Sequence, residues 1–363
     1  MPHRPPAVEV ESLADLDRLL ARAPTSLAGW VLQGLDLRAR GPALTGADPR
    51  GALFLGCALD ADVEQVLRER GAVLFPTLPE VPVEVYRSRL YTPEELYDGL
   101  EAGYAETLDA RAYSWTRGER AGLQELLARS LHDLSIDDAL EELADTRRLV
   151  GVMGGHAVPR GSSAYRDAAV LGRSLTRAGL TVATGGGPGA MEAANLGAYL
   201  APHDDAALDE AVDLLAAVPD FAPSVAEWAG AAFDVRRRWP GGSASVGVPT
   251  WFYGHEPPNA FADHIAKYFT NAIREHVLLH VCTAGIVFLP GRAGTVQEVF
   301  QDACENYYAE TAQVAPMVLV GVDYWTREIP VWPLLGALAA GRDMEGSIHL
   351  VDDPTEVVTL LGA

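Results

Sequence analysis

The chain of 363 residues has few cysteines, almost no lysine and a shortage of basic residues. Its three cysteines, Cys57, Cys282 and Cys304, lack close spacing, so we expect neither a disulfide framework nor a thiolate zinc site. The 28 Lys and Arg against 50 Asp and Glu give a formal charge of −22, which argues against nucleic-acid or anionic-membrane partners. No apolar run approaches the roughly 20 residues that span a bilayer, and the first residues lack an apolar signal core. These features favour a cytoplasmic protein.

The shortage of lysine also limits the chemistry. Schiff-base catalysis, including the pyridoxal-phosphate kind, needs a lysine amine. Lys267 is the only lysine in the chain, and the spacing predicts it on the polar face of a helix over 261–280. We expect no cofactor, although a pyridoxal-dependent decarboxylase that uses Lys267 stays as an alternative.

Residues 146–363 show a regular alternation of short β-branched runs and helical patterns, which is typical of a parallel sheet covered on both faces. The predicted strands are 149–153, 180–184, 244–250, 285–289, 317–322 and 348–351. The predicted helices are 163–178, 188–200, 261–280 and one from Pro354. The fold class is therefore α/β, with a doubly wound parallel sheet. A mostly helical insertion at 202–240 acts as a lid, as packing or as a subunit contact.

Residues 1–145 are predicted to form an additional α/β domain with an accessory or regulatory role. Its predicted strands are 30–35, 52–55 and 72–75, and its predicted helices are 13–22, 61–70, 92–102 and 118–145. Two sets of acidic residues occur near predicted helix starts, where capping and solvation explain them. The first set is Asp60, Asp62 and Glu64, and the second is Asp133, Asp137 and Asp138. We therefore expect no metal site.

Glycine-rich turns follow three of the predicted strands. They contain Gly154 and Gly155, then Gly185, Gly186 and Gly187, and finally Gly291, Arg292, Ala293, Gly294 and Thr295. A strand, a glycine turn and a helix start direct unpaired N–H groups and the positive end of a helix dipole at one spot. Because ligands of open parallel sheets bind at the carboxyl ends of strands, these turns predict a phosphate pocket. Thr295-x-x-Glu298 is also a capping box, in which Glu298 has no further role.

Further candidates surround these turns, and each has a structural alternative. Arg274 belongs to a polar stripe with His264, Lys267 and Asn271, and it either faces solvent or forks onto a phosphate. Glu192 and Asn195 bind a ribose or base edge, or they serve capping and packing. The remaining candidates are the loop residues His156 and Ser162 and the aromatic run Trp251, Phe252 and Tyr253, which walls a base pocket or packs in the core.

Taken together, Gly185-Gly-Gly-Pro-Gly-Ala-Met-Glu-Ala-Ala-Asn-Leu-Gly-Ala198 and Pro290-Gly-x-x-Gly-Thr-x-x-Glu298 resemble the LOG (Lonely Guy) family, over about residues 149–325. The resemblance implies a Rossmann-like fold, a homodimer or larger homo-oligomer, and hydrolysis of the N-glycosidic bond of nucleoside 5′-monophosphates. The substrate would be AMP-like or a cytokinin ribotide, and the products a free base and ribose 5-phosphate. The resemblance assigns catalysis to Arg274 and Glu298, and the 5′-phosphate to residues 291–295.

The sequence departs from the family at two positions and in its length. Arg292 stands where a second glycine is usual, and it adds a charged phosphate donor or narrows the pocket. Glu275 stands where the family has a lysine after the arginine. The N-terminal region resembles the extra domains of larger bacterial nucleotide nucleosidases, which can regulate the enzyme. A non-catalytic nucleotide-binding or cofactor-carrier protein of the same fold is the alternative function.

Overall fold

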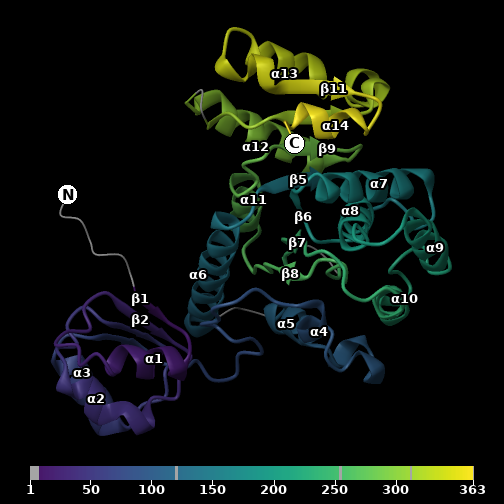
Figure 1. Ribbon diagram of the computed structural model, residues 1–363. Helices are drawn as coiled ribbons and strands as arrows, with labels where there is room; N and C mark the ends of the chain where they lie inside the picture. The colour runs from purple at the N-terminus through teal and green to yellow at the C-terminus, as the bar shows by residue number, and fades with distance from the viewer. Residues whose placement is uncertain (1–7, 119–121, 253–255, 311–312, 363) are drawn as a thin grey trace. The chain divides into compact units, whose positions relative to one another are not determined.

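The computed structural model describes residues 8–118, 122–252, 256–310 and 313–362 (Figure 1). The chain divides into two compact units, each built from two segments. The first unit comprises Met1–Arg89 and Gly118–Asp138, and the second comprises Leu90–Arg117 and Ala139–Ala363. Residues 90–117, which the sequence analysis assigns to the N-terminal domain, thus belong to the same unit as the large sheet.

The first unit contains a four-stranded parallel sheet in the order β1-β2-β3-β4. Its strands are β1 (Val8–Val10), β2 (Trp30–Gln33), β3 (Leu53–Leu55) and β4 (Val73–Phe75), and its helices are α1 (Leu13–Leu20), α2 (Gly41–Gly46) and α3 (Ala61–Glu69). The predicted strands and the helices near 13–22 and 61–70 are confirmed. Strand β1 escaped prediction because three residues at a sheet edge carry too little periodicity.

Residues 90–117 are short helical turns rather than one helix. Helix α4 (Pro93–Leu96) begins at a capping box made by Thr92 and Glu95, and Gly99 ends the regular backbone with φ of 90°. A 3-10 turn at Leu100–Ala102, another at Tyr104–Glu106 and helix α5 (Leu108–Thr116) complete the segment. Helix α6 (Leu123–Asp145) follows, and the division between the units falls within it.

The second unit is built on a seven-stranded parallel sheet in the order β11-β10-β9-β5-β6-β7-β8. Its strands are β5 (Leu149–Met153), β6 (Thr181–Thr184), β7 (Val246–Gly247), β8 (His264–Ile265), β9 (Ile286–Phe288), β10 (Met317–Val320) and β11 (Ile348–Val351). The predicted doubly wound, Rossmann-like α/β fold is confirmed. The chain runs outward from β5 to β8 and then returns to β9, so the strand order reverses between β5 and β9.

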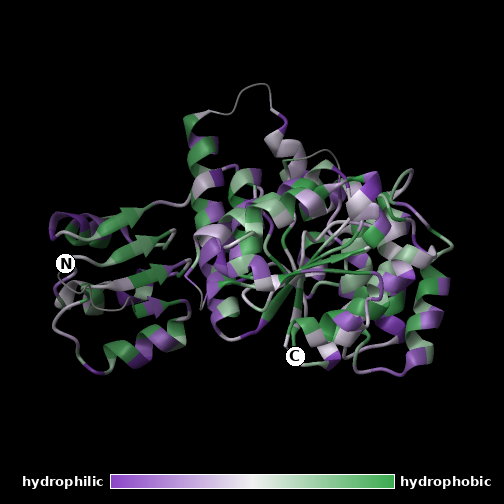
Figure 2. Cartoon of the chain, turned by 90° about the horizontal axis from the view of Figure 1, so that it is seen from above, coloured by the Kyte–Doolittle hydropathy of each residue, from purple (hydrophilic) through white to green (hydrophobic). Residues whose placement is uncertain are grey.

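Helices cover both faces of this sheet. Helices α7 (Ser163–Arg177) and α8 (Ala190–Tyr199) pack on one face, and α11 (Asn271–His280) and α12 (Ala293–Tyr308) lie on the other (Figure 1). Helices α7 and α8 can approach closely because Gly197 has no side chain. A Cβ at this position would lie only 1.8 Å from the Ala169 carbonyl oxygen. Figure 2 shows hydrophobic strands inside and hydrophilic residues on the outer helix surfaces. A π-helical turn at Tyr324–Glu328 precedes α13 (Val331–Ala339). A 3-10 turn at Asp343–Ser347 and β11 follow, and α14 (Glu356–Leu360) ends the unit.

The insertion forms α9 (Asp205–Leu215) and α10 (Val225–Arg238). Leu208, Leu215 and Val235 are fully buried in the main core cluster of the second unit. The insertion therefore packs as part of the core, which is one of the three uses that the sequence leaves open. Among the described residues, no helix combines the length and the apolar composition needed to cross a membrane.

The predicted helix over 261–280 is wrong in its first half. Residues 264–265 form strand β8, and helix α11 starts only at Asn271. The backbone of this segment pairs with its neighbours, as in the bond from Ala266 N to Gly247 O (2.8 Å). Phe261, in the turn before β8, and Ile265, in β8, are both buried, but they do not share a helix face. The polar stripe of His264, Lys267, Asn271 and Arg274 therefore does not exist as one surface.

Candidate functional site

A cavity of about 500 Å³ opens at the carboxyl ends of the central strands. The loops after β5, β6 and β9 and the first turns of α11 and α12 form its walls. The predicted site residues among its lining are Gly154, Gly155, Gly185, Gly187, Arg274, Arg292, Ala293, Gly294, Thr295 and Glu298. The cavity lies where the strand order reverses, which is where open parallel sheets bind their ligands.

The loops around the cavity are joined through Gly155. Gly155 N donates to Pro290 O (3.2 Å) in the loop after β9, and Gly155 O accepts from Ala190 N (3.1 Å) at the start of α8. A Cβ on Gly189 would lie 2.5 Å from Gly155 O, and one on Gly154 would lie 2.9 Å from the Ala190 side chain. Glycine is required here because the three loops approach one another closely.

Helix α12 points its first turn at this cavity. The helix begins after Arg292, and its first intrahelical bond runs from Val296 N to Arg292 O (3.0 Å). The N–H groups of Ala293, Gly294 and Thr295 therefore have no acceptor within the helix, and they form a site suited to an anion. The N-cap makes no side-chain hydrogen bond, and Thr295 is the third residue of the helix. The capping-box alternative for Thr295 and Glu298 is thus wrong.

Arg274 enters the cavity from the first turn of α11. Its Nε donates to Val248 O (2.7 Å), and its Nη2 donates to Gly185 O (3.4 Å). A Cβ on Gly185 would lie 2.3 Å from Nη2, so glycine at this position makes room for the guanidinium. These bonds fix the guanidinium, and Nη1 points at Glu298 with a separation of 3.5 Å from Oε1.

Glu298 is the carboxylate closest to Arg274, and only 13% of its side chain is exposed. Burial raises the pKa of Glu298, the Arg274 charge lowers it, and the negative Glu275 raises it again. Asn271 Nδ2 (2.6 Å) and Gln297 Nε2 (2.7 Å) hold the Glu275 carboxylate in place. A carboxyl group with a raised pKa in a cavity is suited to proton transfer.

Glu192 lies outside this cavity and is fully buried. Its carboxylate binds Arg160 in a bidentate pair, with separations of 2.9 Å to Nε and 2.5 Å to Nη2. The Arg160 guanidinium also stacks on Trp228, 4.5 Å from the ring centroid. The structure therefore places Glu192 in a buried ion pair beneath the insertion, beside a separate cavity of about 250 Å³.

Asn195 is also fully buried, in a network behind the turn that follows β6. Its Oδ1 accepts from Thr184 Oγ1 (2.7 Å) and Asn259 Nδ2 (3.0 Å), and its Nδ2 donates to Ser245 Oγ (2.9 Å). Thr184 Oγ1 accepts from Gly186 N (2.9 Å). The network supports the glycine turn from behind, and this is where Gly186 lies.

Asn259 connects this network to the turn but was missed in the sequence. Its N donates to Gly186 O (2.8 Å), and its Nδ2 donates to Gly187 O (3.2 Å). The only signal was its position directly after the Pro257-Pro258 pair, which indicates a loop and not a buried polar contact.

Gly291 stands behind the cavity wall. Its carbonyl oxygen accepts from Tyr324 Oη (2.6 Å), and a Cβ on Gly291 would lie 2.1 Å from Thr295 Oγ1. The first residue of the Gly291–Thr295 turn thus sets its shape, and the next four line the cavity.

The loop and aromatic candidates have different surroundings. His156 lines the cavity, with its Nδ1 3.7 Å from Glu256 Oε1, whereas Ser162 caps α7. Trp251 is buried and Phe252 is 64% exposed, while Tyr253 lies outside the described residues. In the segment between β7 and Trp251, the residues that line the cavity are Pro249 and Thr250.

Lys267 is buried, contrary to the predicted polar helix face. Its Nζ lies 2.5 Å from Asp109 Oδ1 and 5.1 Å from the centroid of the Trp251 ring. Burial lowers the pKa of Lys267, and the Asp109 charge opposes this. Lys267 does not line the cavity in the part of the chain that the structure describes, so the amine that a pyridoxal-dependent decarboxylase needs is directed elsewhere.

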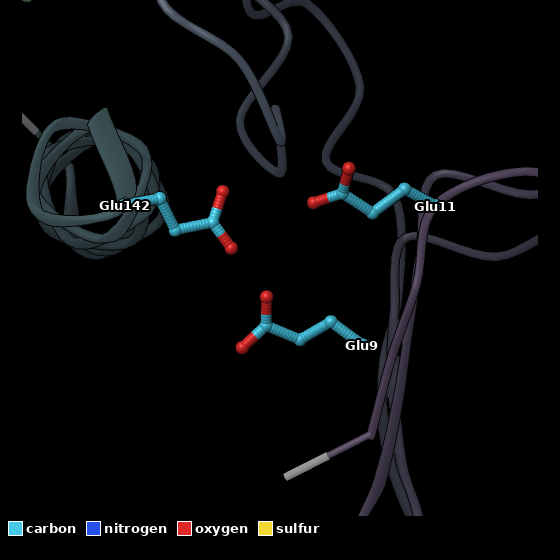
Figure 3. Close-up of side chains that lie close together, drawn as sticks. All are labelled: Glu9, Glu11 and Glu142. Carbon is cyan, nitrogen blue, oxygen red and sulfur yellow. The ribbon is translucent and has the colours of Figure 1, made fainter. Parts of the chain in front are cut away.

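Three glutamates that do not line the cavity, Glu9, Glu11 and Glu142, have no assigned function. Figure 3 shows Glu9 and Glu11, which belong to the first unit, and Glu142 of α6. All three are exposed, and exposed acidic groups commonly occur without an ion. Partial desolvation nevertheless raises the pKa of Glu11, and the negative charge of the neighbouring Glu9 raises it further.

No protein-family model matches the sequence, and no curated protein matches it. Among solved structures, the chain is similar to a molybdenum cofactor binding protein from Rippkaea orientalis, with 17% identity and a TM-score of 0.36, over 60% of this chain and 96% of that one. It is also similar to the molybdenum cofactor carrier protein of Chlamydomonas reinhardtii in two structures, with 17% and 19% identity and TM-scores of 0.38 and 0.33. Both matches cover 60% of this chain, and they cover 99% and 98% of the other. We draw no functional conclusion from similarity at this level.

Proposed function

We propose that the cavity binds a nucleoside 5′-monophosphate and that the protein hydrolyses its N-glycosidic bond. The observation that carries the proposal is the position of Glu298, which shares the cavity with Arg274 and with the unpaired N–H groups that begin α12. A carboxylate that caps its own helix would have no role in catalysis. Glu298 instead lies within reach of a ligand anchored at residues 292–295.

In this proposal the phosphate binds at the start of α12, where N–H groups and the helix dipole favour negative charge. The ribose then lies toward Glu298. Cleavage of the bond between C1′ and the base nitrogen develops positive charge on the sugar, and the carboxylate stabilises this charge. The attacking water forms a bond to C1′ and gives a proton to Glu298. The electrons of the bond between C1′ and nitrogen leave with the base, which takes up a proton. Arg274 orients Glu298 and contributes to the binding of the anion.

A second candidate is a non-catalytic protein that binds a nucleotide or carries a cofactor in the same cavity. Glu275 favours this candidate, because its negative charge lies beside Glu298 where the resembling family has a lysine. The two candidates share the ligand pocket and differ in turnover.

The test is incubation of the purified protein with AMP, CMP, GMP, UMP and a cytokinin ribotide, followed by chromatography of the released base. We expect release from at least one nucleotide. Glu298→Gln should lower the turnover by about 10² to 10⁴, the usual contribution of general acid–base catalysis, and should retain nucleotide binding by calorimetry.

Glu305→Gln is the matched control, because Glu305 lies on the same helix outside the cavity and faces His276. This variant should turn over like the unaltered protein. Tight binding of a nucleotide without release of any base would favour the carrier candidate. Absence of both binding and release would contradict both candidates.

A further inference from the structure

Asp109 is a buried carboxylate on α5, in the segment that precedes the resembling region of the chain. Its side chain is 2% exposed, and it accepts bonds from three side chains of the second unit. Lys267 Nζ (2.5 Å) and Trp251 Nε1 (2.7 Å) bind Oδ1, and Tyr104 Oη (2.6 Å) binds Oδ2. Burying a charge in this way costs free energy unless the charge is paired and hydrogen-bonded, and Asp109 is both.

Two of these partners lie on the extensions of β7 and β8, the last two strands at one end of the sheet. Trp251 follows the residues Pro249 and Thr250, which line the cavity beyond β7. Lys267 follows β8. The two extensions are joined by bonds from Tyr268 N to Pro249 O (3.0 Å) and from Trp251 N to Tyr268 O (2.9 Å). Asp109 therefore holds both strand ends from the side.

The same contacts continue into helix α11. The Trp251 ring stacks on Phe269, with centroids 4.5 Å apart and planes at 27°. Phe269 is followed by Thr270, the N-cap of α11, and Arg274 lies on the first turn of this helix. The position of Phe269 thus determines where α11 begins and where Arg274 enters the cavity.

We propose that Asp109 is a positioning residue for the candidate site. Through its bonds to Trp251 and Lys267, Asp109 determines the placement of Thr250 and Arg274. The proposal rests on the proposed function in one respect, since it takes Arg274 as a ligand-binding group. It makes residues 90–117 a working part of the site, although they lie outside the region that resembles the nucleosidase family.

The test measures the placement of Arg274 without using activity. In the full-length chain, we compare the rate at which phenylglyoxal modifies Arg274 in the unaltered protein and in Asp109→Asn, using peptide mass spectrometry. Arg274 is only 12% exposed and is held by backbone carbonyls, so it should react slowly. Asp109→Asn should raise the rate at least about fivefold and weaken AMP binding by a similar factor. Trp251→Phe keeps the ring stack and removes one bond, and it should give an intermediate rate.

Two controls separate positioning from general loss of stability. Tyr104→Phe removes a bond to the same carboxylate that does not lead to the strand ends, and Leu208→Ala creates a cavity in the core at α9. Both should leave the modification rate of Arg274 unchanged at temperatures where the variants are folded. An equal rate in Asp109→Asn and the unaltered protein, or an equal increase in Leu208→Ala, overturns the proposal. Failure of the proposed function would appear separately, as absent binding of all five tested nucleotides by the unaltered protein.

Discussion

The turns that precede α8 and α12 look alike in the sequence, yet the structure uses them differently. Behind the first turn, Asn195 and its partners satisfy one another in a buried network of neutral groups. Behind the second turn, α12 carries Glu298, whose side chain is 13% exposed, and the buried Asp302, and desolvation raises the pKa of both carboxyl groups. In our proposal the first turn is a structural support, and the second combines an anion site with the catalytic carboxyl group.

The difference shows how one local motif separates stability from function. A satisfied polar network fixes a single conformation, whereas a buried carboxyl group costs stability once it ionises. The α8 side should therefore dominate unfolding measurements, and the α12 side should dominate pH dependence. Four tests probe this contrast.

The largest effect on stability is expected for Asn195→Ala. This change leaves the Thr184 hydroxyl and one Asn259 N–H without their acceptor inside the core, at roughly 1–3 kcal/mol for each buried unsatisfied group. We expect the free energy of unfolding in urea to fall by about 2–4 kcal/mol. Thr184→Val removes fewer bonds and should lose about half as much. An Asn195→Ala variant as stable as the unaltered protein would remove the support role of the α8 turn.

The second test compares two glycines of the α12 turn. A Cβ on Gly291 would lie 2.1 Å from Thr295 Oγ1, whereas a Cβ on Gly294 meets nothing within 4 Å. Gly291→Ala should destabilise the protein by about 1–3 kcal/mol, as overpacking does. Gly294→Ala should be neutral or should gain up to about 1 kcal/mol, since alanine favours a helix. Thermal unfolding without ligand measures the stability of both variants. Similar losses of stability in Gly291→Ala and Gly294→Ala would contradict the different roles of these two glycines.

The third test is Asp302→Asn. Burial raises the pKa of Asp302, and the nearby Glu305 adds to this. A raised folded-state pKa stabilises the protein fully below the unfolded pKa, and this contribution is lost as pH rises through the folded pKa. Asparagine does not titrate, so the variant should gain stability relative to the unaltered protein between pH 4 and pH 8. Urea unfolding at both pH values checks this. If the difference in the free energy of unfolding between the two proteins were the same at both pH values, the pKa of Asp302 would not change on folding.

The smallest change is expected for Glu275→Gln. The negative Glu275 raises the pKa of Glu298, so its removal should lower that pKa. A general base works above its pKa and loses activity below it, and the acidic limb of kcat/KM should therefore move to lower pH. A limb that stays in place would mean that Glu298 is not the group titrating in the profile.

The central sheet could be predicted because its strands are short β-branched runs between turn signals. Strand β8 could not, since apolar residues at 261, 265 and 269 recur every four positions and resemble a helix face. Only pairing with β7 and with Tyr91, far apart in the sequence, makes this segment extended. The local periodicity of a sequence carries no information about pairing partners that are distant in the chain.

The cavity walls followed from the glycine turns, because backbone geometry and strand order bring these turns together. The placement of Asn195 and Glu192 did not follow, since their burial depends on Asn259, Ser245 and Arg160, which are distant in the chain. The capping pattern at Thr295 suggested a helix start three residues too late. The actual start at Ala293 directs Glu298 away from the cap and toward Arg274.

The burial of Lys267 affects covalent chemistry as well as folding. Because its amine is enclosed between a carboxylate and an indole ring, electrophiles in water do not reach it while this unit stays closed. No other side chain of this protein can be acetylated, ubiquitinated or cross-linked as a lysine. Regulation by such modifications therefore requires that the unit first opens around α5.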